Sequence, residues 1–314
     1  MKAYLLNEAG NPENLILSEV SIPSVQHNEV LIRVKAISIN PVDVKARGND
    51  GVLSWIYQNR RPVILGWDIA GLVEMVGESV SEFKVGDAVF GMVNFIGSGN
   101  AYAEYVAAPV SQLALMPANS SFAEAAGATL AALTAYQALR NAGVNEGHNV
   151  LVHGASGGVG HYAVQMAKAL GAIVTGTSSA QNKEFVLALG ADRHIDYSSS
   201  EMLDFPNKYD FALDPAQGET LLRTIDMVKP GGKIITIPSG NIDELIMKKA
   251  AAKNIDLSFI LVASNGNDMQ ALALQIAEGK LKTHIEQTFP FSEMAEAHTR
   301  LEAGKVRGKV IVEL

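Results

Sequence analysis

Residues 149–160 read NVLVHGASGGVG, and no other stretch limits the choice of fold as strongly. An apolar run leads into a loop in which Ala155, Gly157 and Gly160 have the spacing A-x-G-x-x-G, and a helical pattern, Val159–Leu170, follows at once. Small residues let such a loop turn tightly and let backbone N–H groups approach a pyrophosphate, while the helix N-terminus adds a positive dipole. The alternative is a glycine-rich turn without a ligand, which the flanking strand and helix disfavour. The stretch therefore predicts a dinucleotide-binding βαβ unit.

Strand and helix patterns keep alternating after this loop. Apolar runs bounded by glycine, proline or polar residues predict strands, and helical patterns lie between them. Such alternation is typical of a doubly wound parallel sheet in an α/β fold. The predicted strands are Ile173–Thr177, Ile195–Tyr197, Tyr209–Leu213 and Lys233–Ile237, and the predicted helices are Gln181–Leu189 and Thr220–Val228.

The N-terminal part of the chain, residues 1–115, has a different, β-rich pattern, with short apolar runs between glycine, asparagine and proline. A capping box, Ser121 with Glu124, then predicts one long helix that ends before Gly143. Residues 291–304 have an amphipathic helical pattern, and KVIVEL at the end of the sequence predicts a strand that could complete either half. We therefore expect two domains.

The 314 residues carry a formal net charge of −8 and include no cysteine. The acidic balance disfavours a general nucleic-acid binder, because no basic surplus is available to replace phosphate counterions. The lack of cysteine excludes disulfides, thiolate zinc sites, iron–sulfur ligation and a cysteine nucleophile. The N-terminal residues lack the apolar core of a signal peptide, and no apolar run is long enough to span a bilayer. These features predict a cytoplasmic location without membrane or nucleic-acid partners.

The residues after the second strand of the βαβ unit indicate which dinucleotide binds. An NAD site usually has Asp or Glu here, which holds the adenosine ribose 2′-hydroxyl. The chain instead has Ser178, Ser179 and, one helical turn on, Lys183. Hydroxyls and a lysine can bind a 2′-phosphate that a carboxylate would repel, so the pattern favours NADP(H). The alternative is that the serines cap a helix and Lys183 is a surface charge, and both roles are compatible.

A dinucleotide fold that follows a β-rich N-terminal half is an uncommon order, and several short motifs accompany it. They are residues 40–43 (NPVD), 65–68 (LGWD), 85–89 (VGDAV), 153–160 (HGASGGVG), 189–192 (LGAD) and 307–310 (RGKV). With these motifs the chain resembles the medium-chain dehydrogenase/reductase superfamily over essentially its whole length. It is similar to the zinc-free quinone oxidoreductase branch, and the stretches NPVDVKARG, IDYSS, KYDFALD and SNGN resemble NADPH-dependent alkenal/enone oxidoreductases.

The resemblance implies two domains in an α/β chain. A GroES-like, β-rich catalytic domain would comprise residues 1–124 and be completed by residues 290–314. A Rossmann domain that binds NADP would comprise residues 125–289, and the nicotinamide would lie in the cleft between the domains. The resemblance also implies a homodimer formed through edge strands of the Rossmann sheet.

The same resemblance indicates that no metal is bound. Zinc-containing relatives have a cysteine near the position of Asn40 and a His-Glu pair where Trp67 and Asp68 stand. A thiolate and an imidazole suit a tetrahedral zinc site, whereas an amide and an indole do not. We therefore expect no zinc, and we expect the Trp67 indole to fill the space of the metal near the nicotinamide.

Without zinc to stabilise an alkoxide, the easier reaction is hydride transfer to an electron-poor acceptor. A quinone or an α,β-unsaturated carbonyl accepts hydride from NADPH, and the protein orients both and hydrogen-bonds the developing oxyanion. The resemblance places Asn40 beside the nicotinamide or the acceptor, and Tyr57 and Lys45 are candidate donors to the substrate oxygen. For each an alternative stays open. Asn40 could only terminate a strand, Tyr57 could pack within a loop of residues 51–61, and Lys45 could be solvated.

The resemblance also implies the cofactor contacts. Thr129 and Val262 would lie near the nicotinamide and its carboxamide. Asp214 and Pro238, with Ser239, would close over the ribose and the nicotinamide. Lys309 would reach the cleft, with a structural ion pair as an equal alternative. The expected phosphate contacts are Ala155, Ser156, Gly157, Gly158, Val159 and Gly160, and the expected 2′-phosphate contacts are Ser178, Ser179, Lys183 and Tyr197.

Two other functions stay open at this point. A 2-enoyl-thioester reductase would need a basic cluster for a phosphopantetheine or CoA arm, and the N-terminal half shows none. A non-enzymatic sensor would bind NADPH without reducing an acceptor, and the acidic balance disfavours RNA as its partner.

Overall fold

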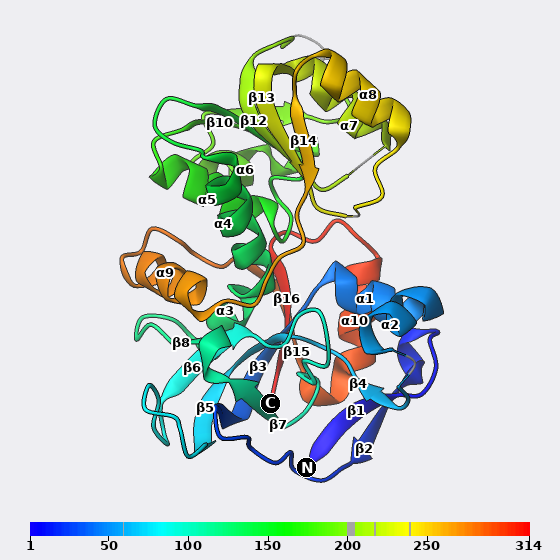
Figure 1. Ribbon diagram of the computed structural model, residues 1–314, viewed down its shortest axis with the longest axis vertical. Coiled ribbons are helices and arrows are strands. Elements are labelled where there is room, and N and C mark those ends of the chain that lie inside the picture. Colours follow the sequence, from blue (N-terminus) through cyan, green and yellow to red (C-terminus); the bar gives the residue numbers. More distant parts are fainter. Residues whose placement is uncertain (59, 200–204, 217, 239) are drawn as a thin grey trace. The chain divides into compact units, whose positions relative to one another are not determined.

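The computed structural model describes residues 1–58, 60–199, 205–216, 218–238 and 240–314 (Figure 1). The chain divides into two compact units. The first comprises Met1–Leu133 and Ala263–Leu314, and the second comprises Thr134–Val262. Residues 125–133 and 263–289, which we expected in the dinucleotide-binding half, therefore belong to the first unit.

The second unit is built on a six-stranded parallel sheet in the order β11-β10-β9-β12-β13-β14. Read by sequence, this is the strand order of a Rossmann sheet. Helices α5 and α6 pack on one face and α7 and α8 on the other (Figure 1), which confirms the predicted doubly wound sheet. The strands are β9 (Asn149–Val152), β10 (Ile173–Ser178), β11 (Arg193–Asp196), β12 (Tyr209–Asp214), β13 (Val228–Thr236) and β14 (Asp256–Phe259), and the helices are α5 (Gly160–Ala169), α6 (Lys183–Ala188), α7 (Gly218–Met227) and α8 (Glu244–Ala252).

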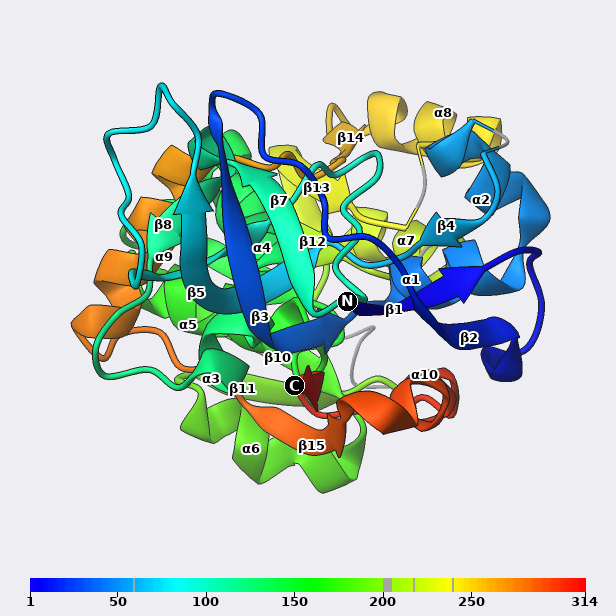
Figure 2. The same cartoon turned by 90° about the horizontal axis from the view of Figure 1, so that it is seen from below.

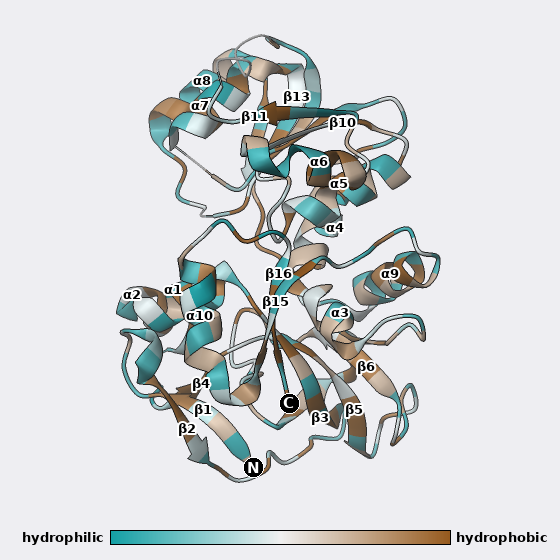
Figure 3. Ribbon diagram, turned by 180° about the vertical axis from the view of Figure 1, so that it is seen from behind, coloured by the Kyte–Doolittle hydropathy of each residue, from teal (hydrophilic) through white to brown (hydrophobic). Residues whose placement is uncertain are grey.

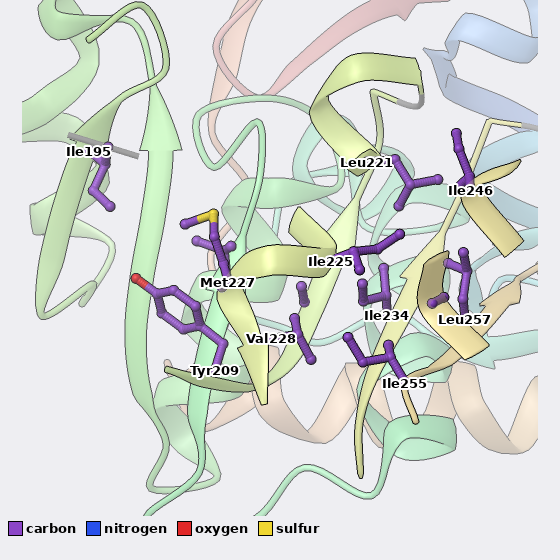
Figure 4. Close-up of a cluster of buried hydrophobic side chains, with 13 residues drawn as sticks. Ile195, Tyr209, Leu221, Ile225, Met227, Val228, Ile234, Ile246, Ile255 and Leu257 are labelled. Carbon is purple, nitrogen blue, oxygen red and sulfur yellow. The ribbon is translucent and has the colours of Figure 1, made fainter. Parts of the chain in front are cut away.

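Part of the core of this unit lies between the sheet and helices α7 and α8 (Figure 4). Leu221 and Ile225 are four residues apart and so share one face of α7. They are buried in one cluster with Ile246 of α8 and with Ile234 and Leu257 of the sheet. Burial of each such side chain contributes about 1.5–3 kcal/mol, and this packing stabilises the half of the sheet that contains β13 and β14.

The first unit contains a seven-stranded sheet and a smaller three-stranded one. The larger sheet has the order β15-β16-β3-β5-β6-β8, with β7 also paired to β3, and Figure 2 shows β3, β5 and β7 side by side. Strands β3, β5 and β6 are rich in hydrophobic residues (Figure 3). The smaller sheet has the order β2-β1-β4. The strands are β1 (Lys2–Leu6), β2 (Leu15–Glu19), β3 (Glu29–Ile39), β4 (Val63–Ile64), β5 (Asp68–Val76), β6 (Ala88–Met92), β7 (Tyr105–Pro109), β8 (Leu113–Leu115), β15 (Ile285–Pro290) and β16 (Lys309–Glu313).

The C-terminal strand, β16, belongs to the larger sheet of the first unit. It runs parallel to β15 and antiparallel to β3, with Val310 opposite Ile39. The next position in this register sets Lys309 against Asn40, although 269 residues separate them in sequence. The pairing therefore brings two predicted site residues together in the first unit.

Two predictions about helices were wrong. The predicted single helix up to Gly143 is divided into α3 (Phe122–Gly127) and α4 (Leu130–Ala142), because the Asp68 carboxylate accepts a hydrogen bond from the Leu130 N–H at the break. The predicted loop around Tyr57 is helical, with α1 (Pro41–Gly48) followed by α2 (Asp50–Tyr57).

The remaining helices of the first unit are α9 (Gly266–Ala277) and α10 (Met294–Glu302), and the second of these confirms the predicted amphipathic helix. Among the described residues, no helix combines the length and the apolar character needed to cross a bilayer.

Candidate active site

Asn40 is the centre of a buried hydrogen-bond network in the first unit. It follows β3 and caps α1, and its backbone N–H donates to Oδ2 of Asp43 at 2.7 Å. Its Nδ2 atom donates to Oδ2 of Asp68 at 2.7 Å and to the Ser38 carbonyl at 3.3 Å. Its Oδ1 atom accepts a hydrogen bond from Nζ of Lys309 at 2.5 Å. Both ends of the amide are thus engaged, and its orientation is fixed.

Asp68, the first residue of β5, holds two parts of the unit together. Its Oδ2 atom accepts from Asn40, and its Oδ1 atom accepts from the Leu130 N–H at 3.1 Å. Burial raises the pKa of this carboxyl, while Lys309 and the hydrogen bond from Asn40 act in the opposite direction. Thr129, predicted near the nicotinamide, is buried beside Asp68, and its hydroxyl donates to the Ala126 carbonyl at 2.7 Å.

Asp43 is a second buried carboxylate in this network. Burial and the neighbouring Asp68 raise its pKa to about 7, although the Asn40 N–H, Lys309 and the Tyr102 hydroxyl stabilise the ionised form. Its Oδ1 atom makes no hydrogen bond of good geometry with the described residues. A buried carboxylate that titrates near neutral pH is a recurring property of functional sites.

A second group of buried polar side chains, Arg47, His298 and Tyr102, was not predicted from the sequence. Nε of Arg47 donates to Nδ1 of His298 at 3.3 Å, and Nε2 of His298 lies 2.9 Å from the Tyr102 hydroxyl. Arg47 also pairs with Glu302. Burial, with Arg47 nearby, lowers the pKa of His298 to about 3, so the imidazole is neutral and its Nε2–H faces Tyr102. The one available sequence signal is the spacing of Arg47, which lies one helical turn after Asp43 and therefore on the same face of α1.

Among the described residues, the other predicted catalytic residues make no hydrogen bond with the Asn40 amide. Trp67 is 0% exposed, its Nε1–H donates to the Gly97 carbonyl at 2.8 Å, and its ring packs against Tyr57 and Phe95. The Tyr57 hydroxyl donates to the Ile64 carbonyl at 3.2 Å. Lys45 is exposed on α1. Trp67 and Tyr57 therefore act first as packing residues, and Lys45 is on the surface.

The predicted phosphate loop lies between β9 and α5 in the second unit. At Gly160 a Cβ atom would lie 2.1 Å from the Gly154 carbonyl oxygen and 2.8 Å from Cα of Ala155, so only glycine fits there. The Ala155 N–H donates to the Thr177 carbonyl at 2.8 Å, which ties the loop to β10. This close backbone packing at a helix N-terminus fits a dinucleotide pyrophosphate.

The predicted 2′-phosphate residues gather at the end of β10. Nδ2 of Asn182 donates to the hydroxyls of Ser156 and Ser179 at 3.1 and 3.2 Å, which joins this end to the phosphate loop. The Ser178 hydroxyl is buried and lies 2.8 Å from Nε2 of His194. Lys183 is exposed at the start of α6, and Tyr197, just after β11, is 57% exposed. Asn182 and His194 were missed because polar residues in a helix or strand give no signal of their own.

The remaining predicted cofactor residues end the central strands. Asp214 closes β12, and its carboxylate accepts from the Ala216 N–H at 2.7 Å. His153 bridges the Thr177 and Thr224 hydroxyls at 3.0 and 2.9 Å. Pro238 follows β13, and Val262 is buried after β14. Gly158 and Val159 lie half-buried in the phosphate loop. Ser239 lies outside the described residues.

Comparisons with known proteins show the family to which the chain belongs. Residues 26–118 match the alcohol dehydrogenase GroES-like domain, and residues 189–312 match the zinc-binding dehydrogenase family. A 2-methylene-furan-3-one reductase of Solanum lycopersicum is 35% identical over 99% of this chain and 79% of its own length. The chloroplastic NADPH-dependent alkenal/one oxidoreductase of Arabidopsis thaliana is 34% identical, with 99% and 79% covered. The solved quinone oxidoreductase of Coxiella burnetii has a TM-score of 0.92 at 34% identity, and 100% and 99% of the two chains are covered.

One of these family descriptions names zinc, and the residues around Asn40 do not fit that metal. The Asn40 amide is held by an ammonium and a carboxylate, and the Trp67 indole donates its proton to a carbonyl. Neither group offers zinc the thiolate or imidazole lone pair that it prefers. Over the described part of the chain, no group of three or more histidine, aspartate or glutamate residues could hold a metal ion.

Proposed function

Because this chain belongs to the quinone oxidoreductase branch of the medium-chain dehydrogenase/reductase superfamily, we propose that it is an NADPH-dependent, zinc-independent reductase of quinones or α,β-unsaturated carbonyls. Its membership of this branch makes it an oxidoreductase. The observation that carries the choice of reaction is the Asn40 network, in which an ammonium and an amide occupy the region that would otherwise offer zinc ligands.

Each unit would contribute one part of the reaction. When bound, NADPH supplies the hydride, and the loop closed by Gly160 would hold its pyrophosphate. The buried network of Asn40, Asp68 and Lys309 would provide a fixed electrostatic environment for the acceptor. An electron-poor acceptor needs orientation and a stabilised oxyanion more than it needs a metal.

The direct test is oxidation of NADPH by the purified protein with 9,10-phenanthrenequinone and with 3-buten-2-one. We expect steady turnover with at least one of them. Tight NADPH binding without turnover of either acceptor would favour the sensor. Turnover restricted to a 2-enoyl thioester would favour the thioester reductase.

The preference for NADPH makes a separate prediction. Ser179→Asp combined with Lys183→Ala should weaken NADPH binding about 10- to 100-fold and leave NADH binding nearly unchanged, because a carboxylate would then face the 2′-phosphate and a cation would be lost. Calorimetric titration with both cofactors measures this. The matched control is Lys248→Ala, which removes an exposed lysine paired with Glu244 on α8. An unchanged cofactor preference in the double variant would contradict the assignment.

We also propose that the protein is a homodimer paired through an edge strand of the parallel sheet. Strands β11 and β14 are the two edges of that sheet. A cytoplasmic location likewise stays a prediction from the sequence.

A further inference from the structure

Lys309 is a buried cation with unused hydrogen-bonding capacity. Its side chain belongs to β16, and the residue is only 3% exposed. Among the described residues, Nζ donates one hydrogen bond, to Oδ1 of Asn40, and forms no ion pair. An ammonium has three N–H groups, so two of them have no acceptor within the described part of the chain. Leaving such donors unsatisfied in the interior costs free energy, and a fold that retains them does so for a reason other than stability.

The N–H and O–H groups of Asn40, Tyr57 and Trp67 are already engaged in hydrogen bonds. The Nδ2 atom of Asn40 uses its protons on Asp68 and on the Ser38 carbonyl. The Tyr57 hydroxyl donates to the Ile64 carbonyl, and the Trp67 N–H donates to the Gly97 carbonyl. Of these buried side chains and Lys309, only Lys309 has N–H groups without an acceptor among the described residues.

The surroundings also hold Nζ in one place and lower the pKa of its ammonium group. Asn40 orients the ammonium through a hydrogen bond, and Asn40 is itself fixed by Asp68. Burial lowers the pKa of Lys309, while the nearby carboxylates of Asp68 and Asp43 act in the opposite direction. A cation held in a water-poor site stabilises a developing negative charge without reorganising.

We propose that Lys309 is a catalytic residue that hydrogen-bonds the carbonyl oxygen of the acceptor and then protonates it. This rests on the proposed function. In an enone, bound NADPH would supply the hydride for a new C–H bond at the β-carbon. The C=C electron pair would then form a double bond to the carbonyl carbon, and the C=O pair would move onto oxygen. The oxygen takes a proton from Nζ to give an enol, which tautomerises to the saturated ketone. The neutral amine then regains a proton from water.

The test compares Lys309→Met and Lys309→Arg with the wild type, by steady-state kinetics and by calorimetric titration with NADPH. We expect Lys309→Met to lower kcat about 100-fold or more and to leave the Kd for NADPH nearly unchanged. Lys309→Arg should recover part of the loss, because arginine donates hydrogen bonds but does not give up its proton. The control is Lys305→Met, an exposed lysine on the same segment.

Lys309→Met leaves two buried carboxylates without their cation, so it could impair folding. The double variant Lys309→Met with Asp68→Asn removes one of these charges and keeps the size of the side chain. If its kcat equals that of Asp68→Asn alone, the proposal is overturned. A rise in the Kd for NADPH with unchanged kcat would also overturn it, because Nζ would then bind a cofactor oxygen. If the wild type reduces no quinone or enone, the proposed function itself fails, and this role fails with it.

Discussion

Asp43→Asn is expected to make the protein more stable than the wild type above pH 7. The pKa of Asp43 in the folded chain is raised to about 7, so the folded state retains a proton that the unfolded chain loses near pH 4. The stabilisation that this proton provides is complete at low pH and is lost as the pH rises through about 7. Asparagine keeps the size of the side chain and an oxygen for the Asn40 N–H, and it does not ionise.

The measurement is chemical denaturation of both proteins at pH 5 and pH 8. The free energy of unfolding of the variant, relative to the wild type, should rise by about 3 kcal/mol over this interval, at 1.36 kcal/mol per pKa unit. Asp192→Asn is the control. Hydrogen bonds from Lys168 and from the Val174 N–H outweigh its partial burial and lower the pKa of Asp192, so its effect on stability changes only below pH 4. A constant difference for Asp43→Asn across the range would show that this carboxylate is ionised in the fold at both pH values.

Gly160→Ala is expected to weaken NADPH binding on the order of 100-fold, about 2.7 kcal/mol. The added Cβ atom would lie 2.1 Å from the Gly154 carbonyl oxygen and 2.8 Å from Cα of Ala155. Both are backbone atoms, so the loop must move and its N–H groups lose their alignment with the pyrophosphate.

Fluorescence titration with NADPH measures this effect, and thermal unfolding shows whether the fold survives. Gly48→Ala is the matched control, since the nearest atom to its Cβ would be 3.9 Å away. Equal affinity of Gly160→Ala and the wild type for NADPH would mean that this loop does not bind the pyrophosphate.

Local sequence patterns predicted the second unit up to β13, because many of its strands are short and apolar and several of its helices end at glycine. They did not predict α8 or β14, which lack these signals. The first unit was harder to predict. The division of the expected long helix depends on Asp68, which lies about sixty residues earlier in the sequence and caps α4 through Leu130. No pattern within residues 121–143 contains that information.

The candidate site shows the same limit. The NPVD motif predicted Asn40 as a site residue, and its N-x-x-D spacing is that of a helix cap. The motif did not indicate that Asp43 would be buried near the carboxylate of Asp68. It also did not indicate that Asp43 would lie near Tyr102, whose hydroxyl contacts His298. Those contacts join β5, α1 and α10, so they depend on tertiary packing that sequence spacing does not encode.

The place of β16 has a consequence for the order in which the molecule is assembled. This strand lies inside the larger sheet, between β15 and β3, yet it is formed by residues 309–313. During synthesis the other strands of that sheet are made first, and residues 36–39 of β3 have no partner on this side until β16 is made, whereas residues 29–33 pair with β7. Such long-range pairing is slow to form, because the chain must close a large loop before the contact is gained. Lys309 belongs to the same strand, so Asn40 can accept its hydrogen bond from Nζ only after β16 has paired with β3. We therefore expect reductase activity to appear later than NADPH binding in a refolding experiment.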